Sequence, residues 1–169
     1  MFAAWARDRW RGTARVGVFL GTHQNRLDAK GRVSVPAGFR SALRDGGEAS
    51  PFVVLRPSHK HPCIEGWPPA AFAELATPLD RLDMFSEDHE DLAAALYADA
   101  FPVDADKEGR IVLPEALAAH AGLADSVVFM GLGRIFQIWE PQAAAARRES
   151  ARQRARAVTL PAASKAGAA

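Results

Sequence analysis

Short apolar runs, each bounded by turn residues, dominate the chain and predict a β-rich α+β fold. Residues 33–35 and 111–113 each place two apolar side chains on one face of an extended segment, which is typical of half-buried strands. Residues 52–55 and 127–130 are continuously apolar and predict fully buried strands. One more strand is expected over 134–139.

Short helices are predicted directly after the two half-buried strands, over residues 36–44 and 114–121. Each starts with a proline, whose fixed φ suits the first helical position. Each is expected to stop at glycine, at Gly46 and Gly47 in the first case and at Gly122 in the second, because glycine is the commonest residue just after a helix.

Two segments of the chain are near copies of each other. Residues 28–36 read DAKGRVSVP, and residues 106–114 read DKEGRIVLP. In each copy a strand leads into a tight turn at Gly31 or Gly109, where glycine accepts the positive φ that such turns often need. A unit of about 45 residues buries too little surface to be stable alone. We therefore expect the two copies to pack together or interleave their strands, as a pseudo-symmetric dimer within one polypeptide.

A helical insertion is predicted between the two copies. Ser86 is placed to cap a helix whose first turn is rich in acids, and Leu92 and Leu96 are expected to face inward until Phe101 ends the helix. The domain boundaries follow from these elements: a first repeat with added helices, a second repeat and a basic tail rich in alanine and arginine, at 18–97, 98–143 and 144–169.

Charge is sorted along the chain, although the formal net charge is only +1 over 169 residues. Residues 22–44 carry five basic side chains and one acid, whereas the rest of the central region is acidic. A basic patch of this kind favours an anionic partner. The single cysteine, Cys63, cannot form an internal disulfide, and no apolar run is long enough to span a membrane. These features predict a cytoplasmic protein with no membrane partner.

The repeated turn, an Asp-x-x-x-Arg motif, has two compatible interpretations. In one, the aspartate and arginine form a salt bridge or an Asx turn that fixes the hairpin. In the other, the hairpin presents Lys30 and Arg32 to DNA, where arginine can bond two guanine acceptors at once and lysine can meet a phosphate. Asp28 would then orient the guanidinium group of Arg32.

The chain resembles the MraZ family at this motif and at three others. The matching segments are FLGTHQNRLDAKGR at 19–32, HPC at 61–63, DKEGRIVLP at 106–114 and HAGL at 120–123. The resemblance implies two copies of an AbrB-like swapped hairpin that form a pseudo-dimeric double-split barrel. It also implies a sequence-specific DNA-binding transcriptional regulator, expected to act as a repressor at direct repeats upstream of the cell-division and cell-wall gene cluster, its own promoter included.

The resemblance extends to partners, assembly and site residues. It implies double-stranded DNA as the partner, association with the nucleoid, and ring-shaped homo-oligomers such as an octamer. The first turn supplies the expected DNA contacts, and the second copy supplies a weaker set because Glu108 stands where the first copy has Lys30. The residues so assigned are Arg26, Asp28, Lys30, Gly31 and Arg32, and in the second copy Asp106, Lys107, Gly109 and Arg110.

The start of the native chain is also predicted from the resemblance. Family members usually have methionine where this chain has Val18, and a GTG codon is read as valine inside a gene but as methionine at its start. Residues 1–17 are therefore expected to be a non-native or disordered extension.

Metal binding, catalysis and protein binding are the other classes of function to consider. His59, His61 and Cys63 alternate and could share one face as zinc ligands, but a fourth ligand is missing and a packed segment is favoured, so no metal or other cofactor is expected. No nucleophile elbow, Walker loop or HExxH motif is present, so catalysis is not expected. An antitoxin-like or protein-binding module on the same fold is the alternative function.

Overall fold

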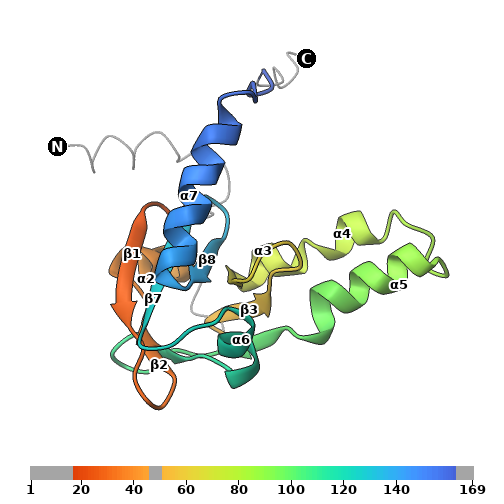
Figure 1. Ribbon diagram of the computed structural model, residues 1–169. Helices are drawn as coiled ribbons and strands as arrows, with labels where there is room; N and C mark the ends of the chain where they lie inside the picture. The colour runs from red at the N-terminus through yellow and green to blue at the C-terminus, as the bar shows by residue number, and fades with distance from the viewer. Residues whose placement is uncertain (1–16, 46–50, 163–169) are drawn as a thin grey trace.

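The computed structural model describes residues 17–45 and 51–162 (Figure 1). Except for Gly17, the extension predicted over residues 1–17 lies outside these ranges, as do the helix stop predicted at Gly46 and Gly47 and the end of the basic tail.

A six-stranded antiparallel sheet and a separate two-stranded ribbon form the body of the molecule. The order of strands in the sheet is β1-β7-β8-β4-β3-β5, so strands of the two repeats lie side by side. The sheet strands are β1 (Thr22–Arg26), β3 (Val53–Pro57), β4 (Ile64–Trp67), β5 (Phe101–Val103), β7 (Ser126–Gly131) and β8 (Phe136–Trp139), and the ribbon consists of β2 (Arg32–Ser34) and β6 (Arg110–Val112). This is the mixed, β-rich architecture that the sequence predicts.

One face of the sheet carries the main core, which is built around aromatic side chains. Phe19, Phe129 and Phe136 are fully buried there, and Phe39 from α2 (Ala37–Arg44) packs edge-on against Phe19 with ring centroids 5.3 Å apart. Leu117 of α6 (Glu115–His120) is buried in the same core. The repeat aligns Phe39 with Leu117, so the two copies contribute equivalent side chains to a single core.

The two helices begin one residue later than the sequence analysis predicts. Pro36 and Pro114 are the residues before the first helical turn, because their ψ angles of 141° and 136° are extended rather than helical. The second helix ends as expected, with Gly122 at a φ of +61°.

The predicted insertion forms a helical arm that projects from the body (Figure 1). It consists of α3 (Pro69–Ala73), α4 (Ala76–Leu79), α5 (Glu87–Ala93) and the π-helix η1 (Ala94–Ala98). Ser86 caps α5 as predicted, since its hydroxyl accepts a hydrogen bond from the His89 amide at 3.2 Å. The prediction that Leu92 faces inward is wrong: its side chain is 41% exposed and α5 buries no residue, because the arm extends past the edge of the core.

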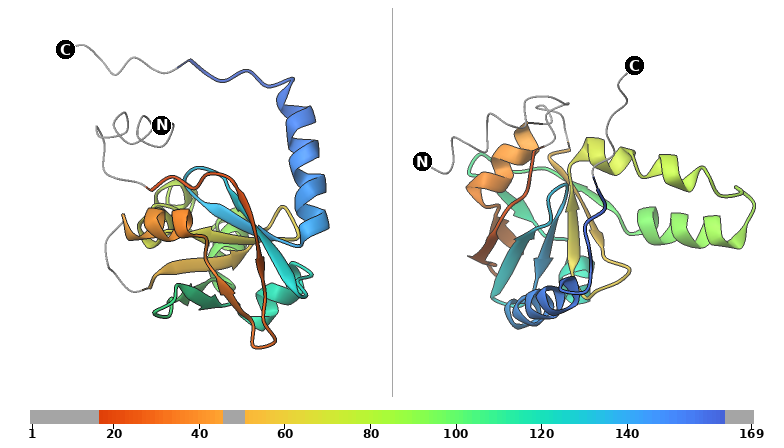
Figure 2. Two further views of the ribbon diagram at one scale, coloured as in Figure 1. Left: turned by 90° about the vertical axis from the view of Figure 1, so that its left-hand side faces the viewer. Right: turned by 90° about the horizontal axis from the view of Figure 1, so that it is seen from above.

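On the opposite face of the sheet, the start of the C-terminal helix α7 (Pro141–Ala155) packs against β7, while the rest of the helix extends beyond the body (Figure 2). Ala144 of this helix packs in a small cluster with Val128, Met130 and Trp139, while the neighbouring residues of β7 face the main core. Successive side chains of β7 therefore point to opposite faces of the sheet, and both faces are packed. Among the residues that the structure describes, no helix is both long and apolar enough to cross a membrane.

Candidate nucleic-acid interface

The two repeated motifs meet in the β2–β6 ribbon. Val33 of the first copy pairs with Ile111 of the second, and the strands are antiparallel. The ends of the ribbon are closed by reciprocal bonds between copies: the Val35 amide donates to the Gly109 carbonyl at 3.0 Å, and the Leu113 amide donates to the Gly31 carbonyl at 2.8 Å. Each hairpin therefore completes the other, which is the interleaving that the sequence analysis allows for.

The first turn is fixed by the carboxylate of Asp28. Its Oδ1 accepts hydrogen bonds from the amides of Lys30 and Arg32, both at 2.9 Å, and its Oδ2 accepts one from Arg32 Nε at 2.7 Å. Gly31 takes a φ of +74°, which closes the turn without steric strain. The hydrogen bond from the Arg32 amide is the main cause that holds the pKa of Asp28 below its ordinary value.

The second turn repeats this geometry around Asp106. The amides of Glu108 and Arg110 each lie 2.9 Å from Asp106 Oδ1, and Arg110 Nε lies 2.7 Å from its Oδ2. Gly109 has a φ of +76°, and the pKa of Asp106 is lowered mainly by the Arg110 amide. The salt-bridge interpretation of the motif is therefore correct in both copies.

One contact distinguishes the two turns. Arg110 Nη2 donates to Glu108 Oε2 at 2.7 Å, so the guanidinium group of Arg110 is held by two carboxylates, whose hydrogen bonds and charges raise its pKa. At the equivalent place in the first copy stands Lys30. Among the described residues, the two Nη groups of Arg32 donate no hydrogen bond, so they are available to a ligand.

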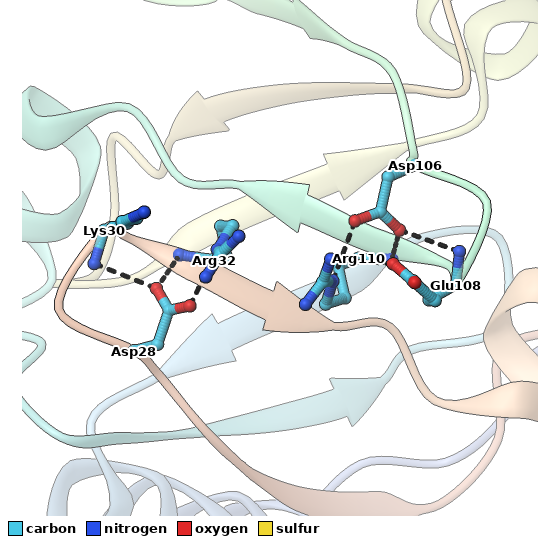
Figure 3. Close-up of polar contacts among 6 residues, drawn as sticks. All are labelled: Asp28, Lys30, Arg32, Asp106, Glu108 and Arg110. Carbon is cyan, nitrogen blue, oxygen red and sulfur yellow. Dashed lines mark hydrogen bonds and ion pairs between the residues drawn. The ribbon is translucent and has the colours of Figure 1, made fainter.

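The outer face of the ribbon displays both arginines. Antiparallel register puts Arg32 opposite Val112 and Ser34 opposite Arg110, so these four side chains share one face, while Val33 and Ile111 are buried on the other. Both arginine side chains are 36% exposed. Figure 3 shows the two arginines side by side between the two aspartates, with Lys30 and Glu108 at the outer ends.

The structure brings most of the predicted site residues together, but not all of them. Lys30 and Lys107 are exposed in their respective turns, next to the ribbon. Arg26 is also exposed, but it ends β1 and pairs with Ser126, so it belongs to the six-stranded sheet and not to the ribbon.

Arg40 is a site residue that the sequence analysis missed. It extends from α2 across to the second turn, where a Cβ atom on Gly109 would lie only 2.4 Å from Arg40 Cδ. Its Nη1 donates a hydrogen bond to the carbonyl oxygen of Val35 at 3.0 Å. Arg40 therefore stabilises the place where the two copies meet. The only sequence signal was its place in the basic stretch 22–44.

His59, His61 and Cys63 lie in the loop between β3 and β4, where His59 is exposed, His61 is half-buried and Cys63 is buried. Burial raises the pKa of the Cys63 thiol to about 12, and burial is also the main cause that lowers the pKa of His61. The His61 ring packs against Trp139 at 5.7 Å between centroids. In residues 17–45 and 51–162, no group of three or more histidine, cysteine, aspartate or glutamate side chains is placed to hold a metal ion.

The interleaved turns define a class of protein: a fused swapped-hairpin pseudo-dimer that presents paired arginines on one ribbon. The family model described as "MraZ protein, putative antitoxin-like" matches the chain twice, over residues 18–94 and 96–157. The chain belongs to the MraZ family of transcriptional regulators, as its resemblance at the two motifs predicted.

Relatives named "Transcriptional regulator MraZ" match most of the chain. The protein of Gluconacetobacter diazotrophicus is 70% identical over 150 residues, which cover 87% of this chain and 94% of that protein. The protein of Gluconobacter oxydans is 69% identical over 142 residues, covering 83% and 87%. The protein of Azorhizobium caulinodans is 41% identical over 138 residues, covering 82% and 87%.

Proposed function

We propose that this protein is a sequence-specific DNA-binding repressor that acts on direct repeats upstream of the cell-division and cell-wall gene cluster, its own promoter included. It acts in the cytoplasm, in association with the nucleoid, and has no catalytic role. The observation that carries the proposal is the outer face of the β2–β6 ribbon, where Arg32 is oriented by Asp28 and both its Nη groups are without a partner among the residues that the structure describes.

The geometry of the ribbon suits the major groove of DNA. A two-stranded antiparallel ribbon fits that groove, and an arginine fork can bond the O6 and N7 acceptors of guanine together. Asp28 Oδ2 accepts a hydrogen bond from Nε of Arg32, which restricts the orientation of the guanidinium group and leaves its Nη edge for a base. Lys30, exposed beside it, supplies a phosphate contact that carries affinity without reading sequence.

The first turn carries most of the recognition. Residues 104–123 hold two basic and four acidic side chains, so the field around the second turn repels phosphate. Glu108 also occupies part of the Arg110 fork. Arg110 therefore acts chiefly to hold its own hairpin, on which the pairing of β6 with β2 depends.

Assembly into a ring raises the DNA affinity of these small ribbons. One ribbon contacts few bases, but several ribbons at fixed spacing make later contacts intramolecular and raise avidity by about 10²–10⁴. Two features favour self-assembly: the sheet has unpaired edges at β1 and β5, and the arm exposes Met84 and Phe85, the latter by 93%. We propose a ring-shaped homo-oligomer such as an octamer.

The test is binding to the DNA upstream of the gene. We expect wild-type protein to shift a fragment that contains the native direct repeats at concentrations where a shuffled fragment of equal length stays free. Equal binding to both fragments at the same salt concentration would contradict sequence-specific recognition, because the phosphate contacts alone do not distinguish them.

An antitoxin-like module that binds another protein is the second candidate function. The exposed Phe85 on the arm favours it, since large exposed apolar side chains mark protein-binding surfaces, and the description of the family model carries the same term. The two functions separate in one comparison: an antitoxin that acts only by capture would not shift the upstream fragment, whereas the proposed repressor does so without any second protein.

A further inference from the structure

A basic cleft lies on the opposite face of the sheet from the main core, under helix α7. It has a volume of about 260 Å³ and is bounded by α7 on one side and by the start of β1 and the end of β7 on the other. Three arginines of the helix line it, Arg147, Arg148 and Arg152. Since ligand pockets of known proteins start at about 300 Å³, the cleft suits a small ligand or one group of a larger ligand.

The positive charge in the cleft is poorly compensated. Among the described residues, Arg147 and Arg148 form no ion pair, and Arg152 reaches Glu149 only at 3.5 Å. The charge of Arg147 contributes to the lowered pKa of His61, after the larger effect of burial. Arg148 and Arg152 are four residues apart on the helix, where like charges repel each other. An anion in the cleft would relieve this repulsion.

A buried amide offers neutral donors beside the arginines. Gln137 of β8 lines the cleft and is only 6% exposed. Its Oε1 accepts the indole N–H of Trp139 at 2.9 Å, which assigns the carbonyl side of the amide. Within the described part of the chain, the Nε2 group of Gln137 donates no hydrogen bond, so a residue that is mostly buried brings a free donor to the cleft.

We propose that this cleft binds the phosphate group of a small phosphorylated metabolite. Arginine forks bond phosphate oxygens in pairs, and the amide of Gln137 supplies an additional donor. DNA phosphate is the other source of the same chemistry. We favour a free metabolite because helix α7, which lines the cleft, and the β2–β6 ribbon lie at different ends of the body (Figure 1).

The cleft is connected to the DNA-reading turn by a single strand. Gly21 and Thr22 line the cleft at the start of β1, and Arg26 ends the same strand just before the first turn. A ligand in the cleft is thus positioned to act on β1 and thereby on the turn. This inference concerns a second site and does not depend on the proposed DNA contacts.

Calorimetry with inorganic pyrophosphate tests the proposal, at a constant ionic strength of about 0.15 M. The cleft variant carries Arg148→Gln and Arg152→Gln. The control variant carries Arg154→Gln and Arg156→Gln, which remove the same charge from the last turn and C-cap of α7, outside the cleft. We expect saturable binding to wild type and control, and affinity weaker by at least about tenfold in the cleft variant.

Three outcomes would overturn the proposal: no pyrophosphate binding to wild type, equal loss in both variants, or loss of operator DNA affinity in the cleft variant without any pyrophosphate binding. The last outcome would assign the arginines to DNA. Circular dichroism establishes that both variants are folded. Operator binding without pyrophosphate is expected to stay at the wild-type level in the cleft variant, so failure of this site is distinguishable from failure of the DNA-binding proposal.

Discussion

Replacement of Arg32 by alanine should reduce operator binding far more than replacement of Arg110, although the repeat makes the two positions equivalent. Within residues 17–45 and 51–162, both Nη groups of Arg32 are without a hydrogen-bond partner, whereas Arg110 Nη2 is bonded to Glu108. A bidentate contact with guanine is worth about 1–3 kcal/mol of discrimination, which corresponds to a loss of roughly 5- to 150-fold for each ribbon that reads a guanine.

Arg110→Ala should act on the fold of the second turn instead. It removes the Nε bond to Asp106 and leaves Glu108 and Asp106 close together without a cation. We therefore expect a lower melting temperature and a modest loss of DNA affinity. Arg32→Ala also removes a hydrogen bond to its aspartate, so both variants are expected to destabilise a turn. Only the measured DNA affinity distinguishes them.

Fluorescence anisotropy with labelled operator DNA measures the difference, at matched salt and with folding checked by circular dichroism. Arg32→Ala should also bind operator and shuffled DNA with more similar affinities, because the lost contact reads a base. If both folded variants lose equal affinity and equal sequence preference, the two copies share the DNA and the role assigned to Glu108 is wrong.

Four further predictions follow from the same site and from the arm. Lys30→Ala should weaken binding to all sequences alike and lower the slope of log affinity against log salt by about one unit in anisotropy titrations. Glu108→Lys should free Arg110 and raise operator affinity in the same assay; a decrease would contradict the proposed competition. Phe85→Ser should lower the oligomer mass in light scattering while circular dichroism remains that of the folded protein, since Phe85 is 93% exposed and lies outside the core. Because the pKa of Asp28 is depressed in the fold, the stabilisation it provides is complete above the ordinary value of 3.8 and is lost as the pH falls through the lower folded value. The melting temperature should therefore fall more steeply below pH 3.8 for wild type than for Asp28→Asn.

Local features of the site could be predicted from the sequence because they depend on neighbouring residues. The turn at Gly31 needs only a glycine with positive φ and an aspartate that reaches amides two and four residues ahead. The same pattern at Gly109 then predicts the same turn. Both are found with nearly identical distances, so the repeat was a reliable signal for local geometry.

Contacts between the two copies could not be predicted from the sequence pattern. Two packed hairpins and two interleaved hairpins have the same periodicity, and only the bonds from Val35 to Gly109 and from Leu113 to Gly31 distinguish them. Arg40 was missed for the same reason: its role depends on a turn far away in the sequence. The prediction for Leu92 in the arm was wrong for a different reason. Helical spacing indicates an apolar face, but it does not show whether a core lies opposite that face.

The central claim is that the β2–β6 ribbon is the surface that reads DNA. A crystal structure of the protein with its upstream direct-repeat fragment tests this claim most directly. We predict that the ribbon lies in the major groove, with the Nη groups of Arg32 within hydrogen-bond distance of base edges and Lys30 against the phosphate backbone. DNA bound elsewhere, for example along α7 with the ribbon left in solvent, would contradict the claim.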